Sequence, residues 1–250
     1  TTYTVADNST IAGQISNGNV NLCTSNVTDM SKLFHNNNSF NSNIGFWDTS
    51  NVVNMSEIFH NAYSFNQNIA NWDTSNVTRL DYAFAQSAFN QDIGKWNVSS
   101  VTNMEGMFWG TTYFNSNISG WDVSNVTNMS NMFKNVYYFR QNLSSWCVSN
   151  FNSQPYRFMY RSTTSNLYQG PFDPSSYPVW GTCPTDISTP SGAGTTSNPY
   201  LISTFGELRW ITENTNRWGL VYKQTANIEA GFSRNLDGGK GFTPIGTSSN

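Results

Sequence analysis

Apolar residues recur along this chain with a period of about 25 residues. Five tryptophans, Trp47, Trp72, Trp96, Trp121 and Trp146, are spaced 25, 24, 25 and 25 residues apart. Five further apolar columns share the period, and their first members are Val27, Met30, Phe34, Phe40 and Ile44. Because so few apolar positions cannot close a core within one repeat, the pattern predicts that repeats stack and bury these columns against one another.

The spacing within a repeat predicts two short elements. Val101, Met104 and Phe108 have helical spacing, and Thr102 with Glu105 matches a capping box, which predicts one short helical turn. The segment 65–69 lies between turn residues and predicts a short strand that pairs in parallel with the same segment of neighbouring repeats. The predicted fold class is therefore an α+β solenoid of stacked 25-residue coils.

The repeat consensus, Phe-Asn-Gln-x-Ile-x-x-Trp-Asp-x-Ser-Asn-Val-Thr-x-Met-x-x-Phe, spans residues 22–151. It resembles the repeat of BspA-like leucine-rich-repeat surface proteins, a repeat also found in mycoplasma lipoproteins. The resemblance implies a leucine-rich-repeat-like solenoid that is exposed on the bacterial cell surface or secreted, within a longer adhesin-like chain. Asn97 and Cys147 depart from the Asp of the consensus, which weakens any role that needs an unbroken column of carboxylates.

Composition changes along the chain predict the domain boundaries. Residues 1–183 are expected to hold the repeats with a cap at each end, and 184–197, rich in Ser, Thr, Gly and Pro, to form a linker. Residues 198–250 predict a small α/β module, with a helix carrying Phe205, Leu208 and Ile211 and strands near Val221 and Ile228. Segments 194–204 and 242–246 are similar to Glug-type β-helix modules, which implies that the module is truncated and that further domains of the same chain are partners.

Charge and hydropathy exclude several classes of protein. Only 11% of residues are charged and the net charge is −3 with 12 Lys and Arg, so no basic stripe for nucleic acid is expected. No apolar stretch approaches the roughly 18 to 20 residues of a membrane span, so membrane insertion by this segment is not expected. Aromatic residues make up 15% of the chain, which argues against disorder.

The sequence predicts neither catalysis nor a metal or other cofactor. His35 and His60 share a column that no column of carboxylates or thiols supports, so no metal site and no Ser-His-Asp triad is expected. Asp48, Asp73 and Asp122 suit Asx-turns better than a calcium site, because Asn97 and Cys147 interrupt them. Carboxylates elsewhere are scattered singly, unlike the facing pair of a glycosidase. The chain is therefore expected not to be an enzyme.

Variable aromatic residues are the candidate ligand-binding residues. They lie between the predicted helical turn and strand, where other repeats have small polar residues: Tyr63, Trp109, Tyr113, Tyr137 and Tyr138. We expect a patch that binds a surface glycan or a protein, although the rings could equally only fill the loops. The leading hypothesis is a non-catalytic adhesin module, and the alternative is a structural spacer. Catalysis by a downstream part and ice binding are favoured less.

Three cysteines leave one unpaired. Cys23 and Cys147 share a column five repeats apart, and at about 4.8 Å per coil that separation is too great for a disulfide. We expect Cys147 and Cys183 to form a disulfide that attaches the C-terminal cap, with buried free thiols as the alternative. Cys23 is expected to be buried and reduced or to pair with a preceding domain.

Overall fold

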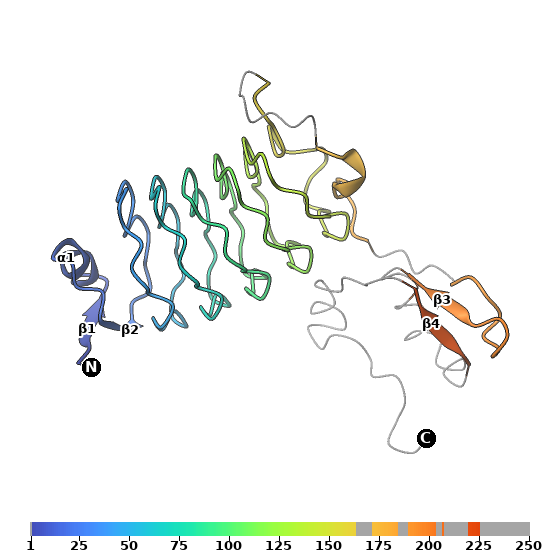
Figure 1. Cartoon of the computed structure of the whole chain (residues 1–250), viewed down its shortest axis with the longest axis horizontal. Helices are drawn as coiled ribbons and strands as arrows, with labels where there is room; N and C mark the ends of the chain where they lie inside the picture. The colour runs from blue at the N-terminus through green and yellow to red at the C-terminus, as the bar shows by residue number, and fades with distance from the viewer. Residues whose placement is uncertain (1, 164–171, 185–189, 204–206, 208–219, 226–250) are drawn as a thin grey trace, which may run out of the picture.

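The computed structural model describes residues 2–163, 172–184, 190–203, 207 and 220–225. Its regular elements are short: strands β1 (Thr4–Asp7), β2 (Leu22–Asn26), β3 (Tyr200–Ile202) and β4 (Tyr222–Gln224), the helix α1 (Ile11–Ser16) and the 3₁₀-helix η1 (Pro174–Ser176). The described residues of the repeats between β2 and η1 form turns and loops. In Figure 1 these repeats lie side by side in a row.

Backbone hydrogen bonds join each repeat to the next at alternate residues. The amide of Lys32 donates to the carbonyl of Ser56 (3.0 Å), and the amide of Asn36 donates to that of His60 (2.8 Å). Between these residues, the amide of His35 donates within its own repeat to the carbonyl of Lys32 (3.1 Å), which closes a turn. The same alternation recurs in the following repeats, so consecutive turns present every second amide to the neighbouring repeat.

The apolar columns form one continuous core. Every tryptophan of the repeat column is nearly fully buried, and the rings of Trp47 and Trp72 stack with centroids 6.5 Å apart. The phenylalanine columns stack in the same way, with 5.4 Å between the rings of Phe34 and Phe59. Each tryptophan also donates its indole N–H to a carbonyl of the preceding repeat, as Trp72 does to Ile44 (3.1 Å). Burial and hydrogen bonding thus fix adjacent repeats in register.

The prediction of a leucine-rich-repeat-like α+β solenoid is wrong, because the described repeats contain neither the expected helical turn nor the expected strand. The backbone takes positive φ at two places in each repeat, for example Lys32 (60°) and Asn36 (59°). An α-helix cannot continue through such residues. A run of consecutive turns places apolar residues three or four positions apart, as a helix does, so the spacing misled the prediction. The described chain is mostly loop and turn.

The segment predicted as a strand is held by asparagine side chains instead. The side-chain oxygen of Asn41 accepts from the amide of Asn66 (2.9 Å), and that of Asn66 accepts from the amide of Asn90 (2.8 Å). Asn90 and Asn115 continue the column in the same way. Because a side-chain carbonyl replaces the backbone carbonyl as acceptor, no strand pairing forms here. Single parallel bridges occur at a different column, whose first members are Asp29, Asn54 and Arg79.

The N-terminal end of the row is covered by α1 and a two-stranded parallel sheet of β1 and β2. Ile11 of α1 and Leu22 of β2 are buried in the same core as the repeats. Asn8 joins this end to the first repeat, because its side-chain oxygen accepts from the amide of Thr28 (2.8 Å).

The other end of the row is covered by the segment around η1. The amide of Leu143 donates to the carbonyl of Ser176 (2.8 Å), and the amide of Val148 donates to that of Thr182 (2.8 Å). The buried guanidinium of Arg161 lies 3.6 Å from the ring centre of Phe172 and donates to the carbonyl of Phe139. These contacts attach the segment after residue 151 to the repeats.

The C-terminal part is described only in short stretches. β3 and β4 pair in parallel, with Tyr200 opposite Tyr222, and β4 lies close to the strand expected near Val221. The expected helix at 205–211, apart from residue 207, the strand near Ile228 and the segment 242–246 lie outside the described residues. The division into 1–183, 184–197 and 198–250 stays a prediction.

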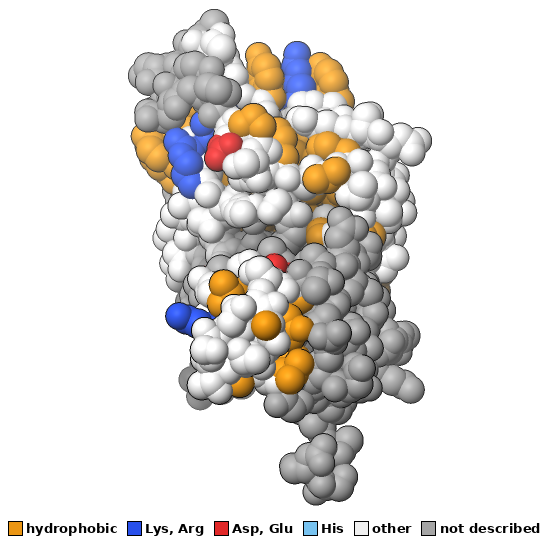
Figure 2. Space-filling model, turned by 90° about the vertical axis from the view of Figure 1, so that its right-hand side faces the viewer, with side chains coloured by type: hydrophobic (Ala, Val, Ile, Leu, Met, Phe, Trp, Pro, Cys, Tyr) orange, Lys and Arg blue, Asp and Glu red, His pale blue; other side chains and the backbone are white. Residues whose placement is uncertain are grey.

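Charged side chains are sparse on the surface. On the end of the molecule seen in Figure 2, hydrophobic side chains form small groups, and few side chains are coloured as charged. Within the described part of the chain, no helix has the length and hydrophobicity needed to cross a membrane.

Candidate functional site

Two of the five candidate aromatic residues form an exposed pair. Tyr113 and Tyr138 occupy equivalent positions in adjacent repeats, and their rings stack with centroids 5.0 Å apart and an interplanar angle of 26°. Both remain accessible, at 57% and 38% of their surface. The amide of Tyr138 donates to the carbonyl of Thr112 (3.2 Å), which fixes one loop against the next. We call Tyr113 and Tyr138 the tyrosine pair.

The other three candidates do not join this pair. Tyr137 is buried, and its hydroxyl approaches the side-chain oxygen of Asn135 (3.4 Å). Tyr63 is 53% exposed but has no ring partner among the residues that the structure describes. Trp109 is half-buried, and the ammonium of Lys134 lies 4.5 Å from its ring centre. The expected five-residue patch is therefore reduced to two rings that are both exposed and stacked.

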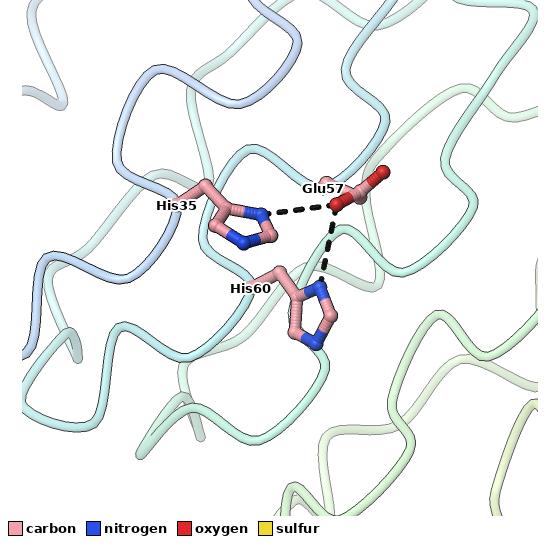
Figure 3. A group of neighbouring side chains, drawn as sticks. All are labelled: His35, Glu57 and His60. Carbon is pink, nitrogen blue, oxygen red and sulfur yellow. Dashed lines mark hydrogen bonds and ion pairs between the residues drawn. The ribbon is translucent and has the colours of Figure 1, made fainter.

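A second cluster lies on the turns of the first two repeats and comprises His35, Glu57 and His60 (Figure 3). One carboxylate oxygen of Glu57, Oε2, lies 3.0 Å from Nδ1 of His35 and 3.5 Å from Nδ1 of His60. The imidazole rings meet edge to face with centroids 4.8 Å apart. Nζ of Lys32 lies 3.4 Å from the other oxygen, Oε1.

The repeat geometry brings these side chains together. Lys32 and Glu57 occupy equivalent positions with positive φ (60° and 55°), and His35 and His60 follow three residues after each. Cross-repeat hydrogen bonds on either side, from Lys32 to Ser56 and from Asn36 to His60, set adjacent turns next to each other. Two imidazoles therefore lie side by side, with a carboxylate from the second turn reaching both.

Burial and charge shift the pKa values in this cluster. Burial lowers the pKa of His60 below its usual value, although the hydrogen bond to Glu57 opposes this effect. Burial alone raises the pKa of Glu57, but the hydrogen bonds from His60 and Lys32 and the charge of Lys32 outweigh it, and the pKa is lowered. A carboxylate and a neutral His60 are thus the favoured forms near neutral pH.

Sequence reasoning missed Glu57. It treated the two histidines as having no acidic partner, because it looked for a carboxylate repeated in every coil. The positions equivalent to Glu57 hold Lys32 and Tyr82, so no such column exists. The available signal was the spacing Glu-x-x-His in one repeat combined with a histidine 25 residues before His60.

Tyr82 extends the cluster into the third repeat. Its ring stacks on His60 with centroids 5.9 Å apart, and its hydroxyl donates to Oε1 of Glu105 (2.6 Å). Burial and the neighbouring carboxylate raise the pKa of Tyr82, so its hydroxyl stays protonated. This contact gives His60 a fixed neighbour on one side.

The cysteines are arranged partly as expected. Cys147 and Cys183 form the expected disulfide. Cys23 is free, but it is exposed rather than buried, because β2 turns this side chain away from the core that holds Leu22.

Comparison with known families agrees with the repeat organisation. A family model described as "Mycoplasma protein of unknown function, DUF285" matches residues 5–88 and again 83–169. The two matches together span more than half of the chain. The chain belongs to this family. The DUF285 matches cover the repeats and both clusters described above, so the tyrosine pair and the His35, Glu57 and His60 cluster lie within the DUF285 region. Neither a curated protein nor a solved structure matches the chain significantly.

Proposed function

We propose that this chain is a non-catalytic binding module of a bacterial surface or secreted protein, and that the tyrosine pair contacts a glycan or protein ligand. The observation behind the proposal is the stacking of Tyr113 and Tyr138 while both stay exposed (57% and 38%). Stacked tyrosines give a rigid contact area with a hydroxyl at each edge, a combination suited to sugar rings and to protein side chains.

Low charge supports contacts of this kind. Only 11% of the residues in the chain are charged, and its net charge is −3. Binding would then depend on ring contacts and neutral hydrogen bonds, and we expect it to depend only weakly on salt. The family match supports a mycoplasma-type repeat protein. The kinship with BspA-like surface repeats and with Glug-type modules remains our proposal from the sequence motifs.

The spacer hypothesis is the alternative, and the hydrogen-bonded row of repeats supports it. A spacer requires extended, regular packing and no ligand, whereas a binding module requires a surface feature that differs between repeats. The tyrosine pair is such a feature, because Ser39 and Ser64 occupy the equivalent positions in earlier repeats. We therefore favour binding.

The test compares tyrosine variants on a glycan array and in a cell-binding assay. Removing both rings with Tyr113→Ala and Tyr138→Ala should weaken binding by about 30-fold or more, since a hot-spot residue contributes about 2 kcal/mol or more. Tyr113→Phe with Tyr138→Phe keeps both rings and should retain most binding. Tyr63→Ala removes an equally exposed but solitary ring and is the matched control.

Two results would contradict the proposal. If the unaltered chain binds neither the array nor cells, the spacer hypothesis is favoured. If the double alanine variant binds as tightly as the unaltered chain, a different surface is responsible. Trp109→Ala is a second control, because the ammonium of Lys134 already covers this ring and we expect little effect on binding.

A further inference from the structure

The cluster of His35, Glu57 and His60 has the donor atoms of a transition-metal site. Two imidazole nitrogens and one carboxylate oxygen lie within 4.8 Å of one another. Donors at about 2.0 to 2.1 Å from a tetrahedral zinc ion lie about 3.3 Å apart. The distances from Oε2 of Glu57 to the Nδ1 atoms, 3.0 and 3.5 Å, lie on either side of that spacing.

The contact between His35 and Glu57 places two possible metal-binding atoms face to face. Nδ1 of His35 is buried and lacks a partner with hydrogen-bond geometry among the described residues, although Glu57 Oε2 is 3.0 Å away. In a neutral imidazole whose proton is on Nε2, the lone pair of Nδ1 would face a carboxylate oxygen. A metal ion between these atoms would convert a repulsive contact into two coordinate bonds.

The position of the cluster suits an exchangeable ion. The three side chains are about one-fifth to one-quarter exposed, so an ion can reach them without unfolding of the turns. His60 is fixed by the ring of Tyr82, and both backbones are fixed by the cross-repeat hydrogen bonds. Rigid support of this kind keeps the donors together at little cost in entropy.

Lys32 is the competitor for the same carboxylate. Its ammonium lies 3.4 Å from Oε1 of Glu57, and its side chain is 63% exposed. A surface ion pair of this type contributes little stability, so Lys32 can turn towards solvent when an ion binds. Oε1 would then be free, while Oε2 already faces both imidazoles.

We propose that His35, Glu57 and His60 form a binding site for one divalent transition-metal ion, of which zinc is the best fit. Imidazole and carboxylate donors suit zinc, whereas calcium and magnesium require ligand sets made of oxygen atoms. Three protein ligands leave a tetrahedral ion one position for water or for a group on a partner. The site is independent of the tyrosine pair and goes beyond the proposed function.

The experiment uses the full chain with its disulfide intact and with Cys23→Ser, because the exposed thiol could itself bind zinc. Isothermal titration with Zn²⁺ should show saturable binding of one ion per chain, and Ca²⁺ and Mg²⁺ should give none at the same site. Substitution with Co²⁺ should give the visible absorption bands of a four-coordinate ion.

Variants assign the ligands. His35→Ala, His60→Ala and Glu57→Gln should each weaken zinc binding by more than about tenfold, since even groups that only support metal ligands are worth 10- to 100-fold. Lys32→Ala should bind at least as tightly as its parent. Asp48→Asn is the matched control, because it removes an exposed carboxylate outside the cluster but keeps a side-chain acceptor for the turn.

A second measurement needs no variant of the cluster, in case such variants unfold. The chain has only two histidines, so NMR of their ring protons reports on both donors directly. Zinc should shift the signals of both rings in step with the titration. The proposal is overturned if no one-to-one binding occurs, if zinc binds while both histidine signals stay unchanged, or if the three ligand variants bind as tightly as their parent.

Discussion

At the scale of single residues, short polar side chains take over the role of backbone partners. In the turn after Trp47, Oδ1 of Asp48 accepts from both the amide and the hydroxyl of Ser50, at 3.0 and 2.7 Å. Asp73 and Asn97 make the same contacts with the serines two residues later. These contacts are the Asx-turns that the sequence predicts for this column.

The Asx-turns predict how stability changes in acid. The hydrogen bonds from Ser50 and Ser75 lower the pKa of Asp48 and of Asp73 below their usual values. A group whose pKa is lower in the folded state stabilises the fold above its unfolded pKa, about 3.9, and this contribution is lost as the pH falls through the folded value. Urea unfolding should therefore show a fall in the free energy of unfolding below about pH 4.

Replacement by asparagine provides the control for this prediction. Asp48→Asn with Asp73→Asn keeps an acceptor for each turn, as Asn97 does in its repeat, but removes the titrating groups. The double variant should lose less stability between pH 5 and pH 3 than the unaltered chain. Identical pH profiles for the two proteins would show that these carboxylates do not contribute.

How far the sequence predicts the candidate sites also depends on single residues. The sequence identifies Tyr113 and Tyr138 as candidates because they interrupt a column of small residues. It does not predict that both rings are exposed. Tyr137 belongs to the same motif and is buried, whereas Tyr63 at the equivalent position of an earlier repeat is exposed, so the motif alone does not fix burial. Glu57 was missed because its contacts with His35 and His60 depend on the path of the turns.

At the scale of elements, the repeat is a run of turns instead of a helical turn followed by a strand. Its period and its buried columns were predictable, because burial requires only that apolar residues recur. The hydrogen-bond partners were not, since the first positive-φ position of a repeat holds residues as different as Glu57 and Tyr82, although asparagine recurs at the second, as in Asn36 and Asn61. Glycine replaces them only at Gly106 and Gly110, which was too weak a signal of left-handed backbone.

Gly106 tests the packing of neighbouring turns. Its φ is 57°, and a Cβ atom added there would collide with the ring of Tyr82 in the adjacent repeat. Gly106→Ala should lower the free energy of unfolding by about 1 to 3 kcal/mol through left-handed strain and overpacking, measured by urea denaturation. In a Tyr82→Ala background, where the ring is absent, Gly106→Ala should cost less stability than it does in the unaltered chain.

Gly13 is the matched control for that substitution. It lies in α1, and a Cβ atom there would meet no atom within 4 Å. Gly13→Ala should leave stability unchanged or raise it by up to about 1 kcal/mol, in line with helix propensity. Equal effects of the two substitutions would contradict the turn packing described for Gly106.

At the scale of the whole molecule, the ends of the row are closed differently. α1, β1 and β2 close the N-terminal end through burial, whereas the segment around η1 combines burial of Phe172 with backbone hydrogen bonds and the Cys147–Cys183 disulfide. The disulfide was predictable from the column positions of the cysteines. The exposure of Cys23 was not, because it depends on which face of β2 meets the core.

Reduction of the disulfide should loosen the C-terminal end of the row. The bonded cysteines are 36 residues apart, and a cross-link of this length contributes about 2 to 4 kcal/mol in the chain-entropy account. Cys147→Ser with Cys183→Ser should lower Tm. In the unaltered chain, peptide mapping without reductant should find Cys23 as the free thiol. A peptide linking Cys23 to Cys183 would contradict the arrangement of the cap.

Both proposed sites depend on one central claim, that residues about 25 positions apart become neighbours because turn amides donate to the next repeat. NMR couplings across hydrogen bonds test this directly. We predict couplings from the amide nitrogen of Asn36 to the carbonyl carbon of His60 and from Asn61 to Ala85, with slow hydrogen exchange at both amides. Couplings to carbonyls four residues earlier in the same repeat, or exchange at the rate of an unfolded peptide, would contradict the account.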